Sequence, residues 1–261
     1  MKTNVYSSDG KSIKEIKLPE LFSEAYREDL IKRAVLSDES REYQPKGAYR
    51  WAGLETGAKY RGRKEMFGAV KNKGIAHLPH EVLPKGQLGK VKRVPQSVKG
   101  RRAHPPKPQK ILIEEMNHKE YVKALKSALA ATANKNIVNG RCNMNFDVSL
   151  PIILDNSFEN LKKTKDVVAV FNFLKLSGFV SRSKKNGVKG PLVIINNSSK
   201  SKAANNIAGV DVVSSKNLKV KHLAPGCKAG RLTIFTENSL SDLQKMFQDD
   251  KVVKQKSKGE D

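Results

Sequence analysis

The sequence predicts an α/β protein: a mostly parallel sheet flanked by helices, with a long irregular basic loop extension. From residue 151 onward, short runs rich in β-branched residues alternate with stretches of helical periodicity. Such alternation is typical of a parallel sheet covered on both faces. Residues 42–110, in contrast, show no sustained periodicity over 69 positions, and a loop of that length has no place inside a compact domain. We therefore expect a globular body formed by residues 1–41 and 111–261, with residues 42–110 inserted as an extended loop.

The first 41 residues predict a hairpin followed by a helix. Strands are expected at residues 4–6 and 12–18, because Asp9-Gly10 between them supplies the positive φ of a tight turn. Pro19 suits the first turn of a helix. Helical spacing then continues toward Arg41 through four apolar residues: Leu30, Ile31, Ala34 and Val35.

Helices and strands are also predicted after the loop. Asn117 and Glu120 have the spacing of a capping box at the start of a helix over about residues 117–133. Its apolar stripe consists of Tyr121, Val122, Leu125, Ala128 and Leu129. Strands are then predicted at 151–155, 191–195, 210–213 and 231–235, helices at about 158–177 and 199–208, and a short link at 181–190. A last helix is expected to begin at Ser239-x-x-Asp242, to bury Leu240, Leu243 and Phe247, and to be followed by a frayed basic tail at 251–261.

The positive charge of the chain is concentrated in the loop. The chain has a formal net charge of +24 and a pI of about 10.0, and within residues 42–110 Lys and Arg outnumber Asp and Glu by 17 to 4. The loop holds 9 of the 18 glycines and 7 of the 11 prolines, and its aromatic residues lie between the cations: Tyr43, Tyr49, Trp51, Tyr60 and Phe67. Charge alone would attract RNA, DNA or an anionic membrane. The mixture predicts a segment that is disordered alone and ordered when nucleic acid surrounds it.

Composition argues against a membrane protein and against a secreted one. The longest apolar stretches, such as residues 167–174, are much shorter than the roughly 20 residues that span a bilayer, and the polar start at Met1 is not typical of a signal peptide. Cys142 and Cys227 form no CxxC pair. We therefore expect two free thiols in a reducing cytoplasm.

Phosphate-binding glycine patterns are absent from the sequence. Gly10-Lys11-Ser12 mimics the end of a P-loop, but the earlier glycine is missing and the context is a hairpin turn. No glycine triplet follows residue 195 or 213, where a dinucleotide fingerprint would lie. We expect no cofactor.

The remaining candidate groups do not form a catalytic or metal site. His77-x-x-His80 would be an incomplete metal site, so RNA contact is the better interpretation of these side chains. Asp147, Asp155 and Asp166 lie on different predicted elements, with no histidine placed to partner them. We expect no enzyme activity, no metal and no small-molecule substrate.

Residues 90–107 form the most distinctive part of the loop, because cations alternate there with small, apolar and proline positions. Such a strand can thread between RNA helices, since Lys and Arg bind phosphates while glycine lets the backbone come close. A solvated linker is the alternative for a run of charge. The internal position, the prolines and the apolar Val91, Val94 and Val98 favour RNA binding.

Several strings resemble one known family. RVPQSVKGRRAHPPK at residues 93–107 closely resembles the loop-closing motif of the fourth protein of the large ribosomal subunit, in its archaeal and eukaryotic form. LKSALAATA (125–133), AANNIAG (203–209), LAPG (223–226) and GRLTIFTE (230–237) are similar to the same family. The resemblance implies an α/β body on the surface of the large subunit and an extension that reaches through ribosomal RNA toward the nascent-peptide exit tunnel. The long carboxy-terminal extension of eukaryotic members is missing, so an archaeal member is expected.

The candidate RNA interface consists of loop cations for phosphates, with aromatic and imidazole rings for bases. Its residues are Arg50, Trp51, Lys59, Tyr60, Arg61, Arg63, Lys64, Lys71, Lys73, His77, Lys90, Lys92, Arg93, Lys99, Arg101, Arg102, His104 and Lys107. The resemblance implies that the loop's tip borders the tunnel, and we expect that tip at Arg61, Arg63, Lys64, Met66 and Phe67.

The sequence thus predicts a structural, ribosomal RNA-binding constituent of the large subunit, in the cytoplasm and in contact with neighbouring large-subunit proteins. Two alternatives remain open. An RNA-modifying enzyme with an α/β catalytic body and a basic arm would need a cofactor pocket and a catalytic constellation. A basic nucleic-acid chaperone would bind any polyanion, and its loop would stay mobile in the complex.

Overall fold

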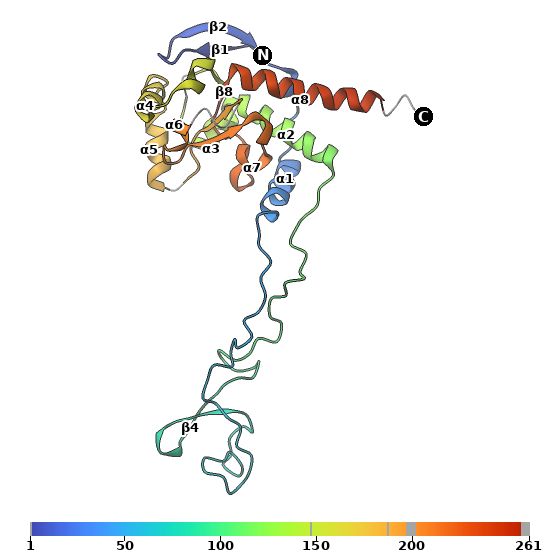
Figure 1. Cartoon of the computed structure of the whole chain (residues 1–261), viewed down its shortest axis with the longest axis vertical. Helices are drawn as coiled ribbons and strands as arrows, with labels where there is room; N and C mark the ends of the chain where they lie inside the picture. The colour runs from blue at the N-terminus through green and yellow to red at the C-terminus, as the bar shows by residue number, and fades with distance from the viewer. Residues whose placement is uncertain (1, 147, 187, 197–201, 257–261) are drawn as a thin grey trace. The chain divides into compact units, whose positions relative to one another are not determined.

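The computed structural model of the protein describes residues 2–146, 148–186, 188–196 and 202–256 (Figure 1). The chain divides into two compact units. We call Met1–Glu42 together with Ile113–Asp261 the body, and Tyr43–Leu112 the extension.

The body contains a six-stranded sheet in the order β2-β1-β5-β8-β6-β7. Only β1 and β2 pair antiparallel, and the other neighbours are parallel. The sheet confirms the predicted α/β class. Its strands lie within two residues of the predicted ranges: β1 (Lys2–Tyr6), β2 (Ser12–Lys17), β5 (Ile152–Leu154), β6 (Leu192–Ile195), β7 (Asp211–Ser214) and β8 (Thr233–Thr236).

Helices cover both faces of this sheet (Figure 1). The α-helices are α1 (Glu28–Ser40), α2 (His118–Ala133), α3 (Lys135–Cys142), α4 (Thr164–Phe173), α5 (Ser177–Asn186), α6 (Lys202–Asn205), α7 (Val220–Leu223) and α8 (Glu237–Lys256). Short 3-10 helices in the body are η1 (Glu20–Ser23), η3 (Asn156–Asn160), η4 (Ser215–Asn217) and η5 (Pro225–Cys227).

The core forms two apolar layers because successive strand residues point to opposite faces of a sheet. Ile153 and Phe235 pack with α1, α2 and α8 on one face, where Phe235 meets Phe22 edge to face at 5.7 Å. Ile152 and Ile234 pack with α4 and α5 on the other face. Because both faces are covered, the strands are continuous apolar runs, which is why the sequence revealed them.

The predicted single helix over 158–177 is wrong. The chain forms η3, then α4, then a reversal, and α5 occupies much of the predicted link at 181–190. At the reversal Leu176 N–H donates to Phe171 O and Lys175 N–H to Asn172 O, with Lys175 at a φ of 56°. These are the two hydrogen bonds of a Schellman helix end, which usually contains glycine. Because lysine occupies the position here, the sequence carried no signal for the break.

Other helix boundaries also differ from the prediction. Pro19 precedes the short η1 instead of opening α1, and Asn117 flanks α2 without a side-chain capping bond. The last helix begins at Glu237, and Ser239 Oγ donates to Thr236 O inside its first turn. This helix extends to Lys256, where a frayed tail was expected. Within the predicted helix at 199–208 the structure describes α6, and residues 197–201 lie outside the described part.

The body is closed where the chain leaves α1 and returns to α2. Ser37 Oγ donates to Glu114 O at 2.7 Å, and Glu114 N–H donates to Ser40 Oγ at 3.0 Å. Nearby, the Tyr121 hydroxyl donates to the buried carboxylate of Asp38 at 2.9 Å. Burial raises the pKa of Tyr121, and the charge of Asp38 raises it further. The two segments are therefore held together by the body's own hydrogen bonds.

One edge of the sheet is strand β2, which is almost entirely exposed. Lys14 of this strand pairs with Glu237 at 3.0 Å, and Lys2 of β1 pairs with Glu15 at 3.9 Å. Across the part of the chain that the structure describes, no helix combines the length and the apolar character needed to cross a membrane.

Candidate nucleic-acid interface

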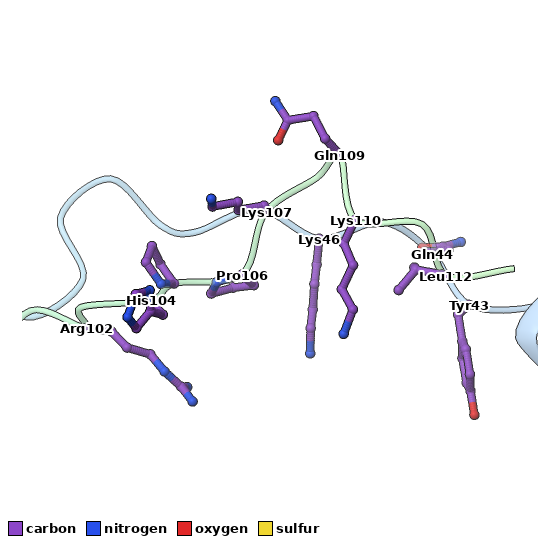
Figure 2. Close-up of a pocket in the computed structure, with 11 residues that line it drawn as sticks. Tyr43, Gln44, Lys46, Arg102, His104, Pro106, Lys107, Gln109, Lys110 and Leu112 are labelled. Atoms are coloured by element: carbon purple, nitrogen blue, oxygen red, sulfur yellow. The ribbon is translucent and has the colours of Figure 1, made fainter.

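The two ends of the extension run beside each other as extended arms. Residues 43–50 and 101–111 are all exposed, and a Cβ added to Gly47 would lie 3.2 Å from Pro108 Cγ. A slot of about 900 Å³ is lined by both arms. Figure 2 shows that side chains from both arms project to the same side of the paired backbones: Tyr43, Lys46, Arg102 and Lys110. Cations next to a ring on one side of a slot suit a phosphate backbone with its bases.

The segment after the slot is folded into turns. Ser97 N–H donates to Val94 O and Gly100 N–H donates to Ser97 O, while the guanidinium of Arg93 reaches Leu54 O at 3.1 Å. Residues 93–100, within the stretch interpreted as a strand that threads between RNA helices, are therefore folded into turns. Arg93 is partly buried and holds the turn, so its charge was a poor guide to its role.

Two glycines make this turn possible. A Cβ on Gly100 would lie 1.9 Å from Val94 O, and one on Gly53 would lie 2.5 Å from the backbone of Gly100. Gly53 also has a φ of +74°. Both positions therefore exclude a side chain, and two stretches far apart in sequence cross there in backbone contact.

A two-stranded antiparallel sheet lies within the extension. It consists of β3 (His80–Val82) and β4 (Leu88–Val91), joined through the 3-10 turn η2 (Pro84–Gly86). Lys59 forms an isolated bridge to His80. Strands of three and four residues are too short to show a periodicity of two, so the sequence did not reveal them.

His80 fastens this hairpin. Its ring is buried, with Nδ1 2.9 Å from Gly89 O and Nε2 2.9 Å from Ala76 O. Carbonyl oxygens only accept, so a neutral imidazole can donate to only one of them at a time. The interpretation of His80 as an RNA contact is wrong, because both ring nitrogens face backbone carbonyls. His77 is exposed, as that interpretation requires.

The predicted tip folds back on itself. Arg61 Nη1 donates to Phe67 O at 2.8 Å, and Val70 N–H donates to Arg61 O at 3.0 Å. The Phe67 ring lies over Gly86, where an added Cβ would be 2.4 Å from it. Met66 and Phe67 remain 51% and 73% exposed. Arg61 thus has an anchoring role, while the other four predicted tip residues face solvent, including Arg63 and Lys64.

Most of the candidate residues are exposed, and few carboxylates accompany them. Within residues 43–112, 14 of 17 cations are exposed and there are only three carboxylates. Glu65 pairs with Arg63 at 3.6 Å, and Glu55 accepts from the Tyr49 hydroxyl at 2.6 Å, which raises the pKa of Tyr49. The exposed candidates are Arg50, Trp51, Lys59, Tyr60, Arg63, Lys64, Lys71, Lys73, His77, Lys90, Lys99, Arg101, Arg102, His104 and Lys107, and the partly buried ones are Arg61, Lys92 and Arg93.

Aromatic side chains stand among these cations. Trp51 is exposed, with the Arg50 guanidinium 5.8 Å from its ring centroid, and Tyr60 is exposed as well. Sequence reasoning left Tyr43, Lys46 and Lys110 out of the candidate set, although they line the slot. They lie outside the distinctive residues 90–107, so composition was their only signal in the sequence.

Histidines, cysteines and carboxylates are the side chains that a metal-binding or catalytic site would use. Among the described residues, no three His, Cys, Asp or Glu side chains come together as a metal site would require. Asp155 follows β5 and Asp166 lies on α4, while Asp147 is outside the described residues. Cys142 is buried and Cys227 is partly buried, both as free thiols.

Comparison with known proteins gives a consistent result over nearly the whole chain. A family model described as the ribosomal protein L4/L1 family matches residues 16–246. A protein of Methanocaldococcus jannaschii named large ribosomal subunit protein uL4 is 44% identical over 266 residues, covering 95% of this chain and 100% of the relative. Proteins of the same name from Methanococcus maripaludis and Methanospirillum hungatei are 41% and 38% identical, covering 95% and 93% of this chain and 100% and 98% of the relatives.

Proposed function

The chain belongs to the ribosomal protein L4/L1 family, and from that premise we propose that it is a structural constituent of the large ribosomal subunit whose extension binds ribosomal RNA. The residues that match the family, 16–246, include the entire extension. The family favours this role over an RNA-modifying enzyme. A ribosomal constituent acts in the cytoplasm, and we expect neighbouring large-subunit proteins to contact the body.

The observation that carries the proposal is the outward direction of the extension's charge. Fourteen exposed cations with three carboxylates among residues 43–112 leave a large positive excess. RNA phosphates can neutralise that excess and release counterions in doing so. The exposed rings of Trp51, Tyr60, His77 and His104 supply surfaces on which unpaired bases can stack.

The small core of the extension indicates a large ligand. Ordering a chain costs on the order of 1–2 kcal/mol per residue in backbone entropy, and the extension buries few side chains to offset that cost: Ala58, Ala69, Val70 and His80. A small anion contacts too few of its residues to compensate. A preformed RNA surface along the segment can compensate, because it supplies contacts at many positions.

Salt dependence tests the proposal. Changing Lys99, Arg101, Arg102 and Lys107 to Gln removes four exposed charges. The slope of log affinity against log salt for large-subunit rRNA is expected to fall by roughly 0.7 to 0.9 units per lost contact. Arg93 is left intact because its side chain holds the turn.

The matched control removes four exposed charges from the body by changing Lys123, Lys135, Lys162 and Lys165 to Gln. It is expected to keep the slope of the unchanged protein. An unchanged slope in the extension variant would contradict the proposal. Equal losses in both variants would favour a chaperone that binds any polyanion.

The family resemblance further suggests that the exposed part of residues 60–67 borders the exit tunnel. Arg63→Gln, Lys64→Gln and Met66→Ser alter exposed side chains and keep the anchoring bond of Arg61. Subunits with these changes should assemble, but nascent-chain stalling or the response to macrolide-type tunnel ligands should change. Unaltered behaviour in both assays would place these residues away from the tunnel wall.

A further inference from the structure

A pocket lined by residues of the body alone contains four cations. It has a volume of about 440 Å³ and is formed by α3, α5 and the segments that precede β6 and β8. The cations are Arg141, Arg182, Lys189 and Arg231. They come from four separate stretches of sequence, so no sequence motif predicted that they lie together. The fold alone brings them to the amino-terminal ends of the parallel strands.

Two of these cations share one carboxylate. Arg231 is only 1% exposed, and its Nη2 donates to Asp211 Oδ2 at 2.7 Å. Its Nε donates to Gly190 O at 2.8 Å, and its Nη1 donates to His222 O at 2.9 Å. Lys189 Nζ lies 3.1 Å from the same Asp211 carboxylate. Each nitrogen of the Arg231 guanidinium therefore already has an acceptor, and Asp211 already has two cationic partners.

The other two guanidiniums have only neutral partners among the described residues. Arg141 Nη2 donates to Pro225 O at 2.9 Å, while its Nη1 is buried and finds no acceptor in the described part of the chain. Arg182 Nη1 donates to Cys142 O at 3.3 Å. Burial lowers the pKa of Arg141, and the nearby charge of Arg231 lowers it further. Arg141 is partly buried, and a charge withdrawn from water without a counterion is costly, so this arrangement favours an added anion.

We infer that this pocket binds one phosphate group of an RNA backbone, held by Arg141 and Arg182. The planar guanidinium fork matches the oxygens of a phosphate and can donate two hydrogen bonds to it. The anion chemistry follows from the pocket itself, whereas the RNA as source of the phosphate rests on the proposed function. The body would then hold RNA at a point independent of the extension.

The first arm of the test uses inorganic phosphate and the full-length protein. The thermal midpoint is measured in phosphate and in chloride at equal ionic strength, for the unchanged protein, Arg141→Gln and Lys123→Gln. Lys123 is exposed on α2 and does not line the pocket, so Lys123→Gln removes the same charge without altering the pocket's lining. The extra stabilisation by phosphate should be retained in Lys123→Gln and lost in Arg141→Gln, because a ligand stabilises the state that binds it.

Comparing phosphate with chloride separates binding from a structural role. If Arg141 only supported the fold through Pro225, its substitution would lower the midpoint equally in both salts. Arg182→Gln, at an exposed position, gives a second variant should Arg141→Gln fail to fold. A phosphate effect that persists in Arg182→Gln as well as in Arg141→Gln would overturn the inference.

The second arm uses large-subunit rRNA. Arg141→Gln should reduce the salt slope of rRNA binding by roughly one contact, about 0.7 to 0.9 log units, relative to Lys123→Gln. Loss of the phosphate effect with an unchanged rRNA slope would mean that the pocket takes a free anion, and the RNA assignment would be wrong. Failure of both arms would leave the extension's binding of RNA untouched, because that is measured with the extension variants.

Discussion

The body buries large side chains in two apolar layers, including Phe158, Phe171 and Phe235, whereas the buried side chains of the extension are Ala58, Ala69, Val70 and His80. The extension instead uses glycines in close backbone contact, single turns and a histidine between two carbonyls. Such contacts occupy few side chains. The difference teaches that a segment held through its backbone keeps most of its side chains available for a ligand.

The body and the extension should differ most in their susceptibility to protease. Sites in the body's core open on global unfolding, which typically costs about 5–15 kcal/mol, while exposed sites such as Arg101 and Arg102 lie in irregular chain. Limited trypsin digestion of free protein should therefore cut first within residues 43–112, and rRNA should suppress those cuts. The prediction that the extension is disordered without RNA would be contradicted by resistance of the free extension.

The next largest difference is expected in how much a core substitution in each unit lowers the unfolding free energy of the body. Phe235→Ala removes a fully buried ring that packs against Phe22, and such changes typically cost about 3–5 kcal/mol. Val70→Ala in the extension should change the body's unfolding free energy by less than about 0.5 kcal/mol. Urea denaturation followed by circular dichroism measures both. Comparable losses for the two variants would show that the units unfold as one.

Removal of the extension should leave a folded body. We propose that residues 44–108 can be replaced by a Gly/Ser linker of about eight residues, because Ser37, Ser40 and Glu114 already hold the two ends together. Shortening the closed loop by three doublings should stabilise the body by about 2 kcal/mol. The unfolding midpoint in urea checks this value. Loss of cooperative unfolding would show that the extension belongs to the core.

A backbone contact inside the extension can be broken alone. Gly100→Ala places a methyl group 1.9 Å from Val94 O, whereas a Cβ on Gly57 meets nothing within 4 Å. Gly100→Ala should weaken rRNA affinity by about tenfold, roughly 1.4 kcal/mol, with no change in the body's thermal midpoint. Gly57→Ala serves as the matched control and should bind like the unchanged protein. Equal affinity of the two variants would mean that the turn does not shape the interface.

The smallest effect is expected for acid sensitivity of the body. Burial raises the pKa of Asp211, but hydrogen bonds from Arg231 and Lys189 outweigh it and hold this pKa below its usual range. A carboxylate with a lowered folded-state pKa contributes stability above its unfolded pKa, about 3.9, and loses it as the pH falls through the folded value. The stability difference between the protein and Asp211→Asn should therefore shrink below about pH 4.

Urea unfolding at several pH values measures this difference. Asp166→Asn, on an exposed position of α4, changes the same charge away from Arg231 and serves as control. If the difference in unfolding free energy between the unchanged protein and Asp211→Asn stays constant from neutral pH to pH 2, Asp211 does not contribute to the acid sensitivity.

The sequence predicted the parts of this fold whose cause is local. The strands at Ile152–Leu154 and Leu192–Ile195 are continuous apolar runs because helices cover both faces of the sheet. The extension was visible through charge, glycine and proline, since none of these builds a core. The reversal at Lys175 was not visible, because a lysine took the left-handed position that glycine usually marks.

The parts that sequence reasoning missed depend on contacts between distant residues. Arg93 has the same charge as its neighbours Lys90 and Lys92, yet its guanidinium donates a hydrogen bond to Leu54 O within the extension. Likewise, nothing near Arg141 or Arg231 in the sequence indicates that both line one pocket. A residue's charge predicts what it can bind, whereas the fold decides which partner it meets.

Strand β2 affects whether free copies of the protein associate with one another before they assemble into the large subunit. As an edge strand it presents a row of backbone N–H and C=O groups with no further strand beside it among the described residues, and such rows are templates for aggregation. Lys14 and Lys17 lie on this strand and Lys11 directly precedes it. A second copy approaching edge to edge would bring the same lysines close together. Strand β2 therefore disfavours self-association in the interval between synthesis and assembly.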